Sequence, residues 1–557
     1  MNSNDTTIQT DSPAQTDVDA VIVGAGFSGL YLLYRLRELG LNVRVYEKAD
    51  DVGGTWYWNR YPGARCDSES HIYCYSFSDE LLDEWEWSER YPEQPEILDY
   101  LRFVSDRLDL RRDILFETEV TTAAFDEDDG TWTVATDAES EVRTQFFITA
   151  VGCLSKPFIP DFDGLESFEG NWYHTGRWPH EPVDFTGERV GVIGTGSSGI
   201  QLIPEVADEA DYLTVFQRTP NYAVDAQNRP LDSERYEEIR NNYDEIWEKA
   251  RLSSSGMPFD RVNVSPSELS AEEVTEILEE RWQQGGFRFT RTFENLLVDE
   301  EVNEVVAQFI RSKIRERVDD PDVAEKLVPT DHPYAAKRPP MNYNGYYRTY
   351  NRDDVRLVDV REAPIEELTP TGICTSGEDY DLDSIIFATG FDAMTGTLLE
   401  MDIKGRDGVR LEERWKDGPR TYLGLMVSGF PNMFTVTGPQ SPSVLTNMPV
   451  SIEYHVEWIS DCIEYVLAGG ERFVEPTADA EAEWVAHTNE VARETLWADV
   501  DSWYRGANVP GKPEIFLPYP GGQDVYRNYC TEVAENGYEG LSMTRSLDTG
   551  DGVAMDS

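Results

Sequence analysis

Two copies of one glycine pattern constrain the fold of this chain more than any other feature of its 557 residues. The first copy lies in DAVIVGAGFSGLYLLYRLRELGLNVRVYEK, from residue 19, and the second in ERVGVIGTGSSGIQLIPEVADEADYLTVFQR, from residue 188. In each, a predicted strand leads into G-x-G-x-x-G, which opens a predicted helix, and a second strand follows. Glycines let the backbone turn tightly and approach a pyrophosphate at the helix N-terminus. The sequence therefore predicts an α/β fold with two Rossmann-like dinucleotide-binding domains.

The residues around the two turns predict different nucleotides. Gly24, Gly26 and Gly29 form the first turn. Glu47 ends the strand after it, where a carboxylate can accept hydrogen bonds from ribose hydroxyls. In the second unit that strand ends at Arg218, whose guanidinium suits the 2′-phosphate of NADP; a solvated arginine at a strand end is the alternative. Two dinucleotide sites indicate internal hydride transfer, for which FAD and NADPH are the usual pair. The second turn comprises Gly194, Thr195, Gly196, Ser197, Ser198 and Gly199.

The order of the segments predicts that the two domains are interleaved. Helical periodicity between about residues 224 and 332, as in EVNEVVAQFIRSKIRERV, predicts a helical insertion. Beyond it, DDVRLVDV and YDLDSIIFATGFD are predicted as strands that return to complete an α/β sheet. The predicted segments are an FAD-binding domain of residues 18–152 and 389–545, an NADP-binding domain of 153–223 and 333–388, a helical insertion of 224–332, and mobile tails of 1–17 and 546–557.

The charge of the chain excludes several classes of partner. Its 106 acidic and 48 basic residues give a formal net charge of −58, spread along the whole sequence. Such a field would repel nucleic acid and anionic lipid, so we expect neither as a partner. We interpret the excess as adaptation to a cytoplasm of high salt, where counterions screen the self-repulsion. An acidic but ordinary protein is the alternative.

Neither a metal site nor a membrane span is expected. The six cysteines lack C-x-x-C or zinc-type spacing, so a reducing compartment without a disulfide framework fits. No apolar run reaches the length of a span, and the polar start MNSNDTTIQTDSPAQTD lacks the apolar core of a signal peptide. We expect a cytoplasmic monomer.

Two longer motifs give the chain a resemblance to a known family. FEGNWYHTGRWP, residues 168–179, matches the pattern F-x-G-x-x-x-H-x-x-x-W-P of type I Baeyer-Villiger monooxygenases, and GGTWYWNRYPGARCD, residues 53–67, matches their second pattern. ATGFD, residues 388–392, is similar to their late flavin-domain segment. The resemblance runs from about residue 18 to 543. The first motif is matched by Phe168, Gly170, His174, Trp178 and Pro179, and the second by Gly54, Trp56, Tyr61, Pro62, Gly63 and Asp67.

The resemblance implies an enzyme that uses FAD, NADPH and O2 to convert a ketone, aromatic or cyclic, into an ester or lactone through a C4a-peroxyflavin. It assigns Arg338, in AAKRPP, as the cation that stabilises the negative charge of the reaction, because guanidinium keeps its proton at any working pH. Asp67 would pair with Arg338 and hold it in position. His174 is implied in domain motion and coupling, with a purely structural packing role as the alternative.

The same resemblance implies the remaining site residues. Lys337, with Arg218 and Thr219, would contact the 2′-phosphate of NADP, while Trp503 would contact the nicotinamide ribose. Trp56 is a further cofactor-binding residue. GPQSPSVLTNMP, residues 438–449, is similar to the substrate-lining segment, although Gln440 and Ser68 depart from the residues usual in the family. The implied substrate-lining residues are Ser443, Val444, Leu445 and Met448.

Three other functions stay open at this point. A flavin-containing or N-hydroxylating monooxygenase, which oxidises nitrogen or sulfur, uses the same two nucleotide units but tends to lack the Trp178-Pro179 ending and the Asp67 and Arg338 pair. A disulfide reductase would need a cysteine pair beside the first turn, which Cys66 and Cys74 do not form. A protein that binds NADP without turnover is the alternative outside the enzymes.

Overall fold

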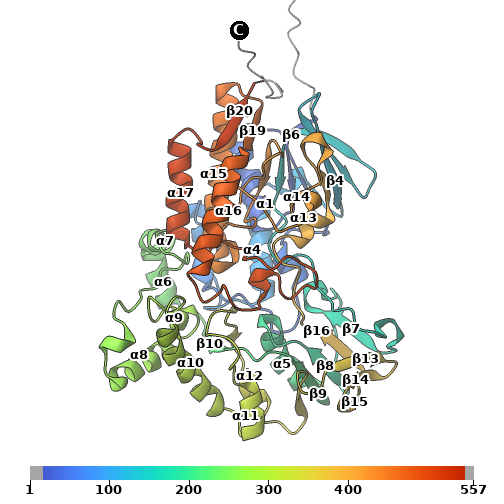
Figure 1. Cartoon of the computed structure of the whole chain (residues 1–557), viewed down its shortest axis with the longest axis vertical. Helices are drawn as coiled ribbons and strands as arrows, with labels where there is room; N and C mark the ends of the chain where they lie inside the picture. Colours follow the sequence, from blue (N-terminus) through green and yellow to red (C-terminus); the bar gives the residue numbers. More distant parts are fainter. Residues whose placement is uncertain (1–16, 546–557) are drawn as a thin grey trace, which may run out of the picture.

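The computed structural model describes residues 17–545. Two sheets occupy its two ends, the first near the top of Figure 1 and the second at lower right, and helices of the insertion lie at lower left. Of the predicted mobile tails, residues 1–16 and 546–557 lie outside the described residues. Asp17, predicted as part of a tail, is instead tied to the first sheet, because its N–H donates to the carbonyl of Arg143 at 2.9 Å.

The first sheet has eight strands and surrounds the first glycine turn. Its order is β17-β4-β5-β6-β1-β2-β3, and β18 lies beside the end of β6 that β5 does not reach. β1, β2, β6 and β18 run parallel, as crossover connections require, whereas β4, β5 and β6 form an antiparallel meander. The strands are β1 (Val18–Val23), β2 (Val43–Tyr46), β3 (Ile114–Leu115), β4 (Val120–Asp126), β5 (Thr131–Thr136), β6 (Glu141–Thr149), β17 (Asp402–Lys404) and β18 (Met433–Thr435).

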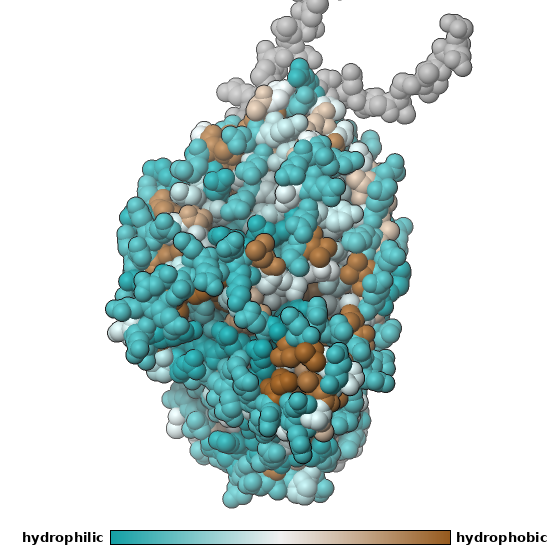
Figure 2. Space-filling view, turned by 90° about the vertical axis from the view of Figure 1, so that its left-hand side faces the viewer, coloured by the Kyte–Doolittle hydropathy of each residue, from teal (hydrophilic) through white to brown (hydrophobic). Residues whose placement is uncertain are grey.

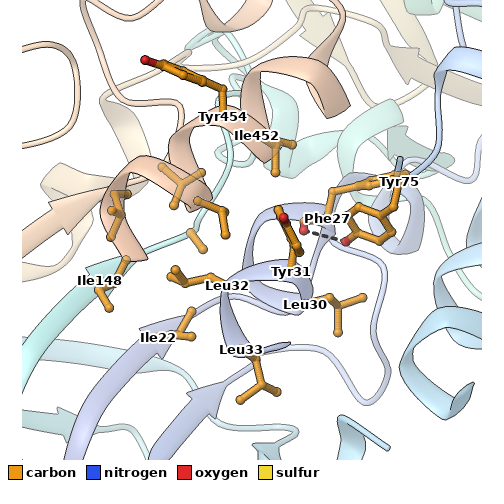
Figure 3. Close-up of a cluster of buried hydrophobic side chains, with 14 of the residues drawn as sticks. Ile22, Phe27, Leu30, Tyr31, Leu32, Leu33, Tyr75, Ile148, Ile452 and Tyr454 are labelled. Atoms are coloured by element: carbon orange, nitrogen blue, oxygen red, sulfur yellow. Dashed lines mark hydrogen bonds between the residues drawn. The ribbon is translucent and has the colours of Figure 1, made fainter. Parts of the chain in front are cut away.

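Two helices from opposite ends of the sequence form the core over this sheet. α1 (Phe27–Glu38) buries Leu30, Leu33 and Leu36, as its apolar spacing predicts, and packs against α15 (Met448–Gly469). Figure 3 shows α1 side chains between strand residues such as Ile22 and the Ile452 side chain of α15. The C-terminal part of the chain therefore completes the first domain.

The second sheet has five strands, all parallel, in the order β12-β9-β8-β16-β7. α5 (Ser197–Glu209) follows its glycine turn. Strands from before and after the insertion meet in it, because β16 lies between β7 and β8. The prediction of two interleaved Rossmann-like domains is confirmed. The strands are β7 (Asn171–His174), β8 (Arg189–Ile193), β9 (Tyr212–Gln217), β12 (Val355–Asp359) and β16 (Ser384–Phe387).

The insertion is helical, as predicted, and its two ends are held together. β10 (Val224–Asp225) pairs in parallel with β11 (Met341–Asn342) where the chain leaves and returns. Its first two helices pack on the core of the first domain through Ile239 and Trp247, whereas α8 and α10 pack on the core of the second. The insertion therefore contacts both domains. Its helices are α6 (Ser233–Asn241), α7 (Tyr243–Arg251), α8 (Ala271–Gln284), α9 (Phe287–Thr290), α10 (Glu300–Arg315) and α11 (Pro321–Leu327).

The remaining elements extend these units. They are α2 (Thr55–Trp58), α3 (Asp79–Glu84), α4 (Gln94–Arg107), α12 (Tyr346–Thr349), α13 (Gly396–Glu400), α14 (Leu411–Arg414), α16 (Ala478–Arg493), α17 (Gln523–Glu535), and the strands β13 (Ile365–Thr369), β14 (Gly372–Thr375), β15 (Asp379–Asp381), β19 (Phe473–Pro476) and β20 (Leu541–Thr544). Between residues 17 and 545 no helix combines the length and apolar character needed to cross a bilayer. The same residues hold no cluster of His, Cys, Asp or Glu that could bind a metal ion, and all six cysteines are free thiols.

Candidate active site

One cavity of about 1520 Å³ runs between the two glycine turns. Its wall takes residues from both Rossmann-like domains, from the loop that follows the insertion and from the C-terminal segment. Most of the residues predicted for cofactors, catalysis and substrate therefore lie around one space. Those in the wall are Gly24, Gly26, Glu47, Trp56, Asp67, Gly194, Thr195, Gly196, Ser197, Ser198, Arg218, Thr219, Lys337, Arg338, Val444, Met448 and Trp503.

The first glycine turn has the shape that a dinucleotide requires. Gly24 has a φ of +103°, and a Cβ on Gly29 would lie 1.8 Å from the Gly24 carbonyl oxygen. A Cβ on Gly26 would lie 3.3 Å from the Cα of Gly54. The glycines thus let α1 begin close against the strand and leave its N-terminus open to a pyrophosphate. These residues fit an FAD molecule.

Glu47 sits in the cavity wall at the end of β2. Its Oε2 accepts from the N–H of Ala25 at 2.7 Å and its Oε1 from the N–H of Ala49 at 2.8 Å. Burial raises the pKa of Glu47, while the hydrogen bonds from these backbone groups lower it, and the net shift is upward. The carboxylate is thereby fixed beside the turn, where a ribose would lie.

The second turn repeats this geometry and faces a basic pair. Gly194 has a φ of +110°, and a Cβ on Gly199 would lie 2.2 Å from the Gly194 carbonyl oxygen. Arg218 and Lys337 both line the cavity beside this turn. Burial lowers the pKa of Lys337, and the charge of Arg218 lowers it further while nearby acids oppose the shift. Two cations at this end of the cavity fit a nucleotide that carries an additional phosphate.

Arg338 and Asp67 form an ion pair in the cavity wall. Nε and Nη2 of Arg338 donate to Oδ2 of Asp67 at 2.8 and 2.6 Å, and Nη1 donates to the carbonyl oxygen of Val444 at 2.7 Å. The Cζ of Arg338 lies over the ring of Phe287, 5.1 Å from its centroid. Burial lowers the pKa of Arg338, but Asp67 and Tyr504 raise it, so the net shift is upward. The guanidinium is a permanent positive charge held in one position.

The linker motif lies outside the cavity wall, except for Arg177. His174 ends β7, is buried, and accepts from the N–H of Gly176 through Nδ1 at 2.9 Å. Its ring meets the edge of Phe391, whereas Trp178 packs against Tyr173. Burial lowers the pKa of His174 to about 4, so the ring is neutral near pH 7. Phe168 and Trp178 are buried, a Cβ on Gly170 would meet the carbonyl of Asp383 at 2.3 Å, and Pro179 is partly exposed.

Only half of the substrate-lining prediction agrees with the cavity. Val444 and Met448 lie in its wall, but Ser443 and Leu445 do not. The chain makes a 3₁₀ turn here, in which the hydroxyl of Ser443 lies 3.6 Å from Met394 Sδ, and Leu445 packs in the apolar cluster that also holds Val444 and Met448. For Ser443 and Leu445 the substrate-lining role stays a prediction.

Ser68 and Gln440, the two residues that depart from those usual in the family, lie in different places. Ser68 lies in the cavity wall. Gln440 lies away from it, with a φ of +69°. Its Oε1 accepts from the N–H and the hydroxyl of Thr421, both at 2.9 Å. These bonds hold a non-glycine residue in a left-handed conformation.

Several residues of the site had no signal in the sequence pattern. Phe287 comes from α9 of the insertion and packs on Arg338. Arg177 lies in the cavity wall with its Cζ 4.5 Å from the ring centroid of Trp58, which lines the same wall. Arg177 and Trp58 fall inside the motifs of residues 168–179 and 53–67, at positions that the motif patterns leave open. Their pairing becomes visible only once the two domains are packed.

The family model for flavin-binding monooxygenase-like proteins matches residues 18–229. A Baeyer-Villiger monooxygenase of Pseudooceanicola batsensis is 46% identical over 537 residues, which cover 96% of this chain and 97% of that protein. The chain belongs to the type I Baeyer-Villiger monooxygenases. Two solved structures can be superposed on the present chain. Each match covers 95% of this chain and 100% of the other protein. A steroid monooxygenase bound to NADP is 51% identical with a TM-score of 0.91, and OTEMO in complex with FAD and NADP is 43% identical with a TM-score of 0.92.

As a Baeyer-Villiger monooxygenase, the enzyme uses FAD, NADPH and O2 to insert an oxygen atom beside the carbonyl of a ketone, which gives an ester or a lactone. The predicted cofactors and reaction class are confirmed. Oxidation of nitrogen or sulfur, the rival reading of the two nucleotide units, is less well supported.

Proposed function

We propose that Arg338 is the catalytic cation of this monooxygenase and that Asp67 holds it in position. The observation that carries this is the ion pair itself, formed in the wall of a cavity that also reaches both glycine turns. Bound FAD would supply the redox chemistry, taking a hydride from NADPH and activating O2. Arg338 then stabilises the negative charge that develops when oxygen is transferred to the ketone carbonyl. Asp67 accepts from two of its N–H groups, which fixes the guanidinium plane.

The cofactor-binding roles are proposed on position in the wall. Gly24, Gly26 and Glu47 would hold FAD, and the turn at 194–199 would hold NADP. Arg218, Thr219 and Lys337 would contact the 2′-phosphate, while Trp503 would cover the nicotinamide ribose and Trp56 the flavin side. Gly29 and Gly199 support the two turns from behind, because their hydrogens face the Gly24 and Gly194 carbonyls.

The substrate is proposed to be an aromatic or cyclic ketone. The cavity wall includes Val444, Met448, Ile452 and Tyr73, which offer an apolar surface to a ring. We further propose a likeness to phenylacetone monooxygenase within the family, over about residues 18–543. Because Gln440 and Ser68 depart from the residues usual in the family, the substrate preference of that enzyme is not carried over. His174 would act on domain motion and coupling.

The cellular setting is also a proposal. Net charge and free cysteines support a monomer in a reducing cytoplasm of high salt. Figure 2 shows hydrophilic residues over most of one face, with one larger apolar area in its lower half. The 48 basic residues comprise 9 Lys and 39 Arg, so ion pairing relies on arginine.

The proposed function is tested by a panel of ketones with product identification. We expect NADPH oxidation to accelerate with aromatic or cyclic ketones, and mass spectrometry to show the ester or lactone one oxygen heavier. NADPH consumption that yields only hydrogen peroxide with every ketone, or an oxidised amine or sulfide as the main product, would contradict the assignment.

A further inference from the structure

A second acidic residue lies two positions after Asp67 and is buried. The side chain of Glu69 is 3% exposed. Its Oε1 accepts from Arg90 Nη2 at 2.8 Å and from Arg288 Nε at 2.9 Å, and its Oε2 accepts from Arg288 Nη2 at 3.3 Å. Burial raises the pKa of Glu69, but Arg288 and Arg90 lower it far below its usual range. Glu69 is therefore a carboxylate paired with two guanidinium groups, and the reaction described above does not use it.

The two arginines belong to different parts of the fold. Arg90 precedes α4 in the first domain, and its Nη1 donates to the carbonyl of Gln284 at the end of α8. Arg288 lies on α9 of the insertion, with its side chain 27% exposed. His71 Nδ1 lies 3.8 Å from Glu69, but burial lowers the pKa of His71 to about 4, so it adds no charge near pH 7. Glu69 thus fastens α9 to the loop that carries Asp67.

The residue before Arg288 contacts the proposed catalytic cation. Phe287 is buried in a cluster with Ile72, Tyr91 and Met257. Its ring lies beneath the Cζ of Arg338 at 5.1 Å from the centroid, within the range of a cation–π contact. Asp67 and Phe287 therefore contact the same guanidinium. Asp67 binds it directly, and Glu69 holds Arg288, the residue that follows Phe287 on α9.

We propose that Glu69 is a positioning residue for Arg338, which it orients through Arg288 and the ring of Phe287. Asp67 and the carbonyl oxygen of Val444 accept from the N–H groups of the guanidinium, and Phe287 meets its Cζ, so three contacts restrict its rotation. Without the Glu69–Arg288 pair, α9 can shift and the guanidinium can tilt away from the reacting oxygen. This rests on the role proposed above for Arg338.

The experiment uses the full-length holoenzyme and three variants. Glu69→Gln would leave the buried Arg90 and the partly exposed Arg288 with a weaker partner and would put the fold of the region at risk, so the pair is broken at Arg288 instead. Arg288→Met keeps an unbranched stem and removes the charge, Phe287→Leu removes the aromatic face, and Arg288→Lys keeps a charge that can reach Glu69. Flavin reduction by NADPH without oxygen, ester formed per NADPH consumed, and crystal structures are compared.

We expect flavin reduction to stay near the wild-type rate in all three variants, because hydride transfer does not use Arg338. Ester per NADPH should fall on the order of tenfold in Arg288→Met and Phe287→Leu, since a small misplacement of a reacting group is costly. Arg288→Lys should retain most of it. The crystal structures should show the guanidinium of Arg338 displaced in Phe287→Leu and in Arg288→Met.

Arg317→Met is the matched control. Arg317 also belongs to the helical insertion. It pairs with the half-buried Asp225, and its guanidinium lies over the ring of Trp282. Arg317→Met should lower the melting temperature and leave the ester formed per NADPH consumed unchanged. Wild-type coupling with an unmoved Arg338 in both Arg288→Met and Phe287→Leu, or equal uncoupling in Arg317→Met, would overturn the proposal. Failure of the wild type to form an ester from any ketone would instead overturn the proposed function.

Discussion

Asp67 binds Arg338 across 271 positions of sequence, with Oδ2 of the carboxylate 2.8 Å from Nε and 2.6 Å from Nη2. Asp67 ends the second family motif near the first glycine turn, whereas Arg338 follows the helical insertion. The contact therefore joins two separate segments at the cavity. An arginine held in this way keeps its charge at every pH the protein survives, so the cation of the site does not depend on titration.

Arg338→Ala should separate the two halves of the reaction. Flavin reduction needs two aligned rings and should persist, whereas ester formation should fall by about 100-fold or more, because one preorganised charge is lost. Arg338→Lys should not restore it fully, because an ammonium lacks the planar fork that Asp67 binds. Parallel assays of NADPH consumption and ester yield check this. Near wild-type ester formation by Arg338→Ala would make Arg338 a surface residue and the mechanism wrong.

Arg218→Ala should reduce the preference for NADPH over NADH. The guanidinium contributes a charged contact to the 2′-phosphate, and its loss should cost NADPH about tenfold in kcat/KM while leaving NADH almost unchanged. Steady-state kinetics with both cofactors measure the ratio. Arg356, which lies on β12 in the second sheet and pairs with Glu378, provides a control in Arg356→Ala. An unchanged ratio in Arg218→Ala would contradict the assignment of this end of the cavity.

Glu47→Ala should weaken FAD binding. The purified wild type should be yellow, and the variant should lose flavin on gel filtration, because both a partner of the ribose and the bonds to the Ala25 and Ala49 N–H groups disappear. The absorbance ratio near 450 and 280 nm, measured against added FAD, reports this. Equal retention of flavin by wild type and variant would exclude Glu47 from the site.

Glu453→Gln should become more stable relative to the wild type as the pH rises. Glu453 lies on α15, accepts from Ser76 and is buried. Burial and, to a smaller extent, the charge of Glu457 raise its pKa, Ser76 and Arg251 oppose the shift, and the net pKa is about 7. Because this pKa lies above the usual value, the contribution of Glu453 to stability is complete below about pH 4.5 and is lost as the pH rises through about 7. The full loss amounts to about 3 kcal/mol.

Melting curves of Glu453→Gln and wild type at pH 5 and pH 8 check this. The melting temperature of Glu453→Gln relative to that of the wild type should be higher at pH 8 than at pH 5. Glu464→Gln, an exposed change on the same helix, is the control and should show no such movement. A difference that is the same at both pH values would show that Glu453 does not titrate in this range.

The melting temperature should rise steadily with KCl. Screening lengths fall from about 10 Å at 0.1 M to about 3 Å at 1 M, so repulsion among the excess acidic residues weakens over this range. Thermal scans over these concentrations test the proposal of adaptation to high salt. A flat or falling curve would favour an acidic but ordinary protein.

The parts of this protein that depend on local backbone geometry could be predicted from the sequence. Gly24 and Gly194 have positive φ angles, and Gly29 and Gly199 leave no room for a Cβ, so the glycine spacing by itself specifies both turns. The apolar spacing in α1 and α10 likewise defined the faces that are buried. Both effects act within a few residues, and the sequence records them directly.

Only the tertiary structure decided which distant side chains meet. The contact of Phe287 with Arg338, the fastening of Arg288 by Glu69 and the contact of Ser443 with Met394 depend on how the insertion and the C-terminal segment pack on the first domain. Such packing is selected by shape and by the pairing of buried charges over hundreds of residues. Spacing within a single sequence carries no record of these pairings, because none of the partners lies near the other along the chain.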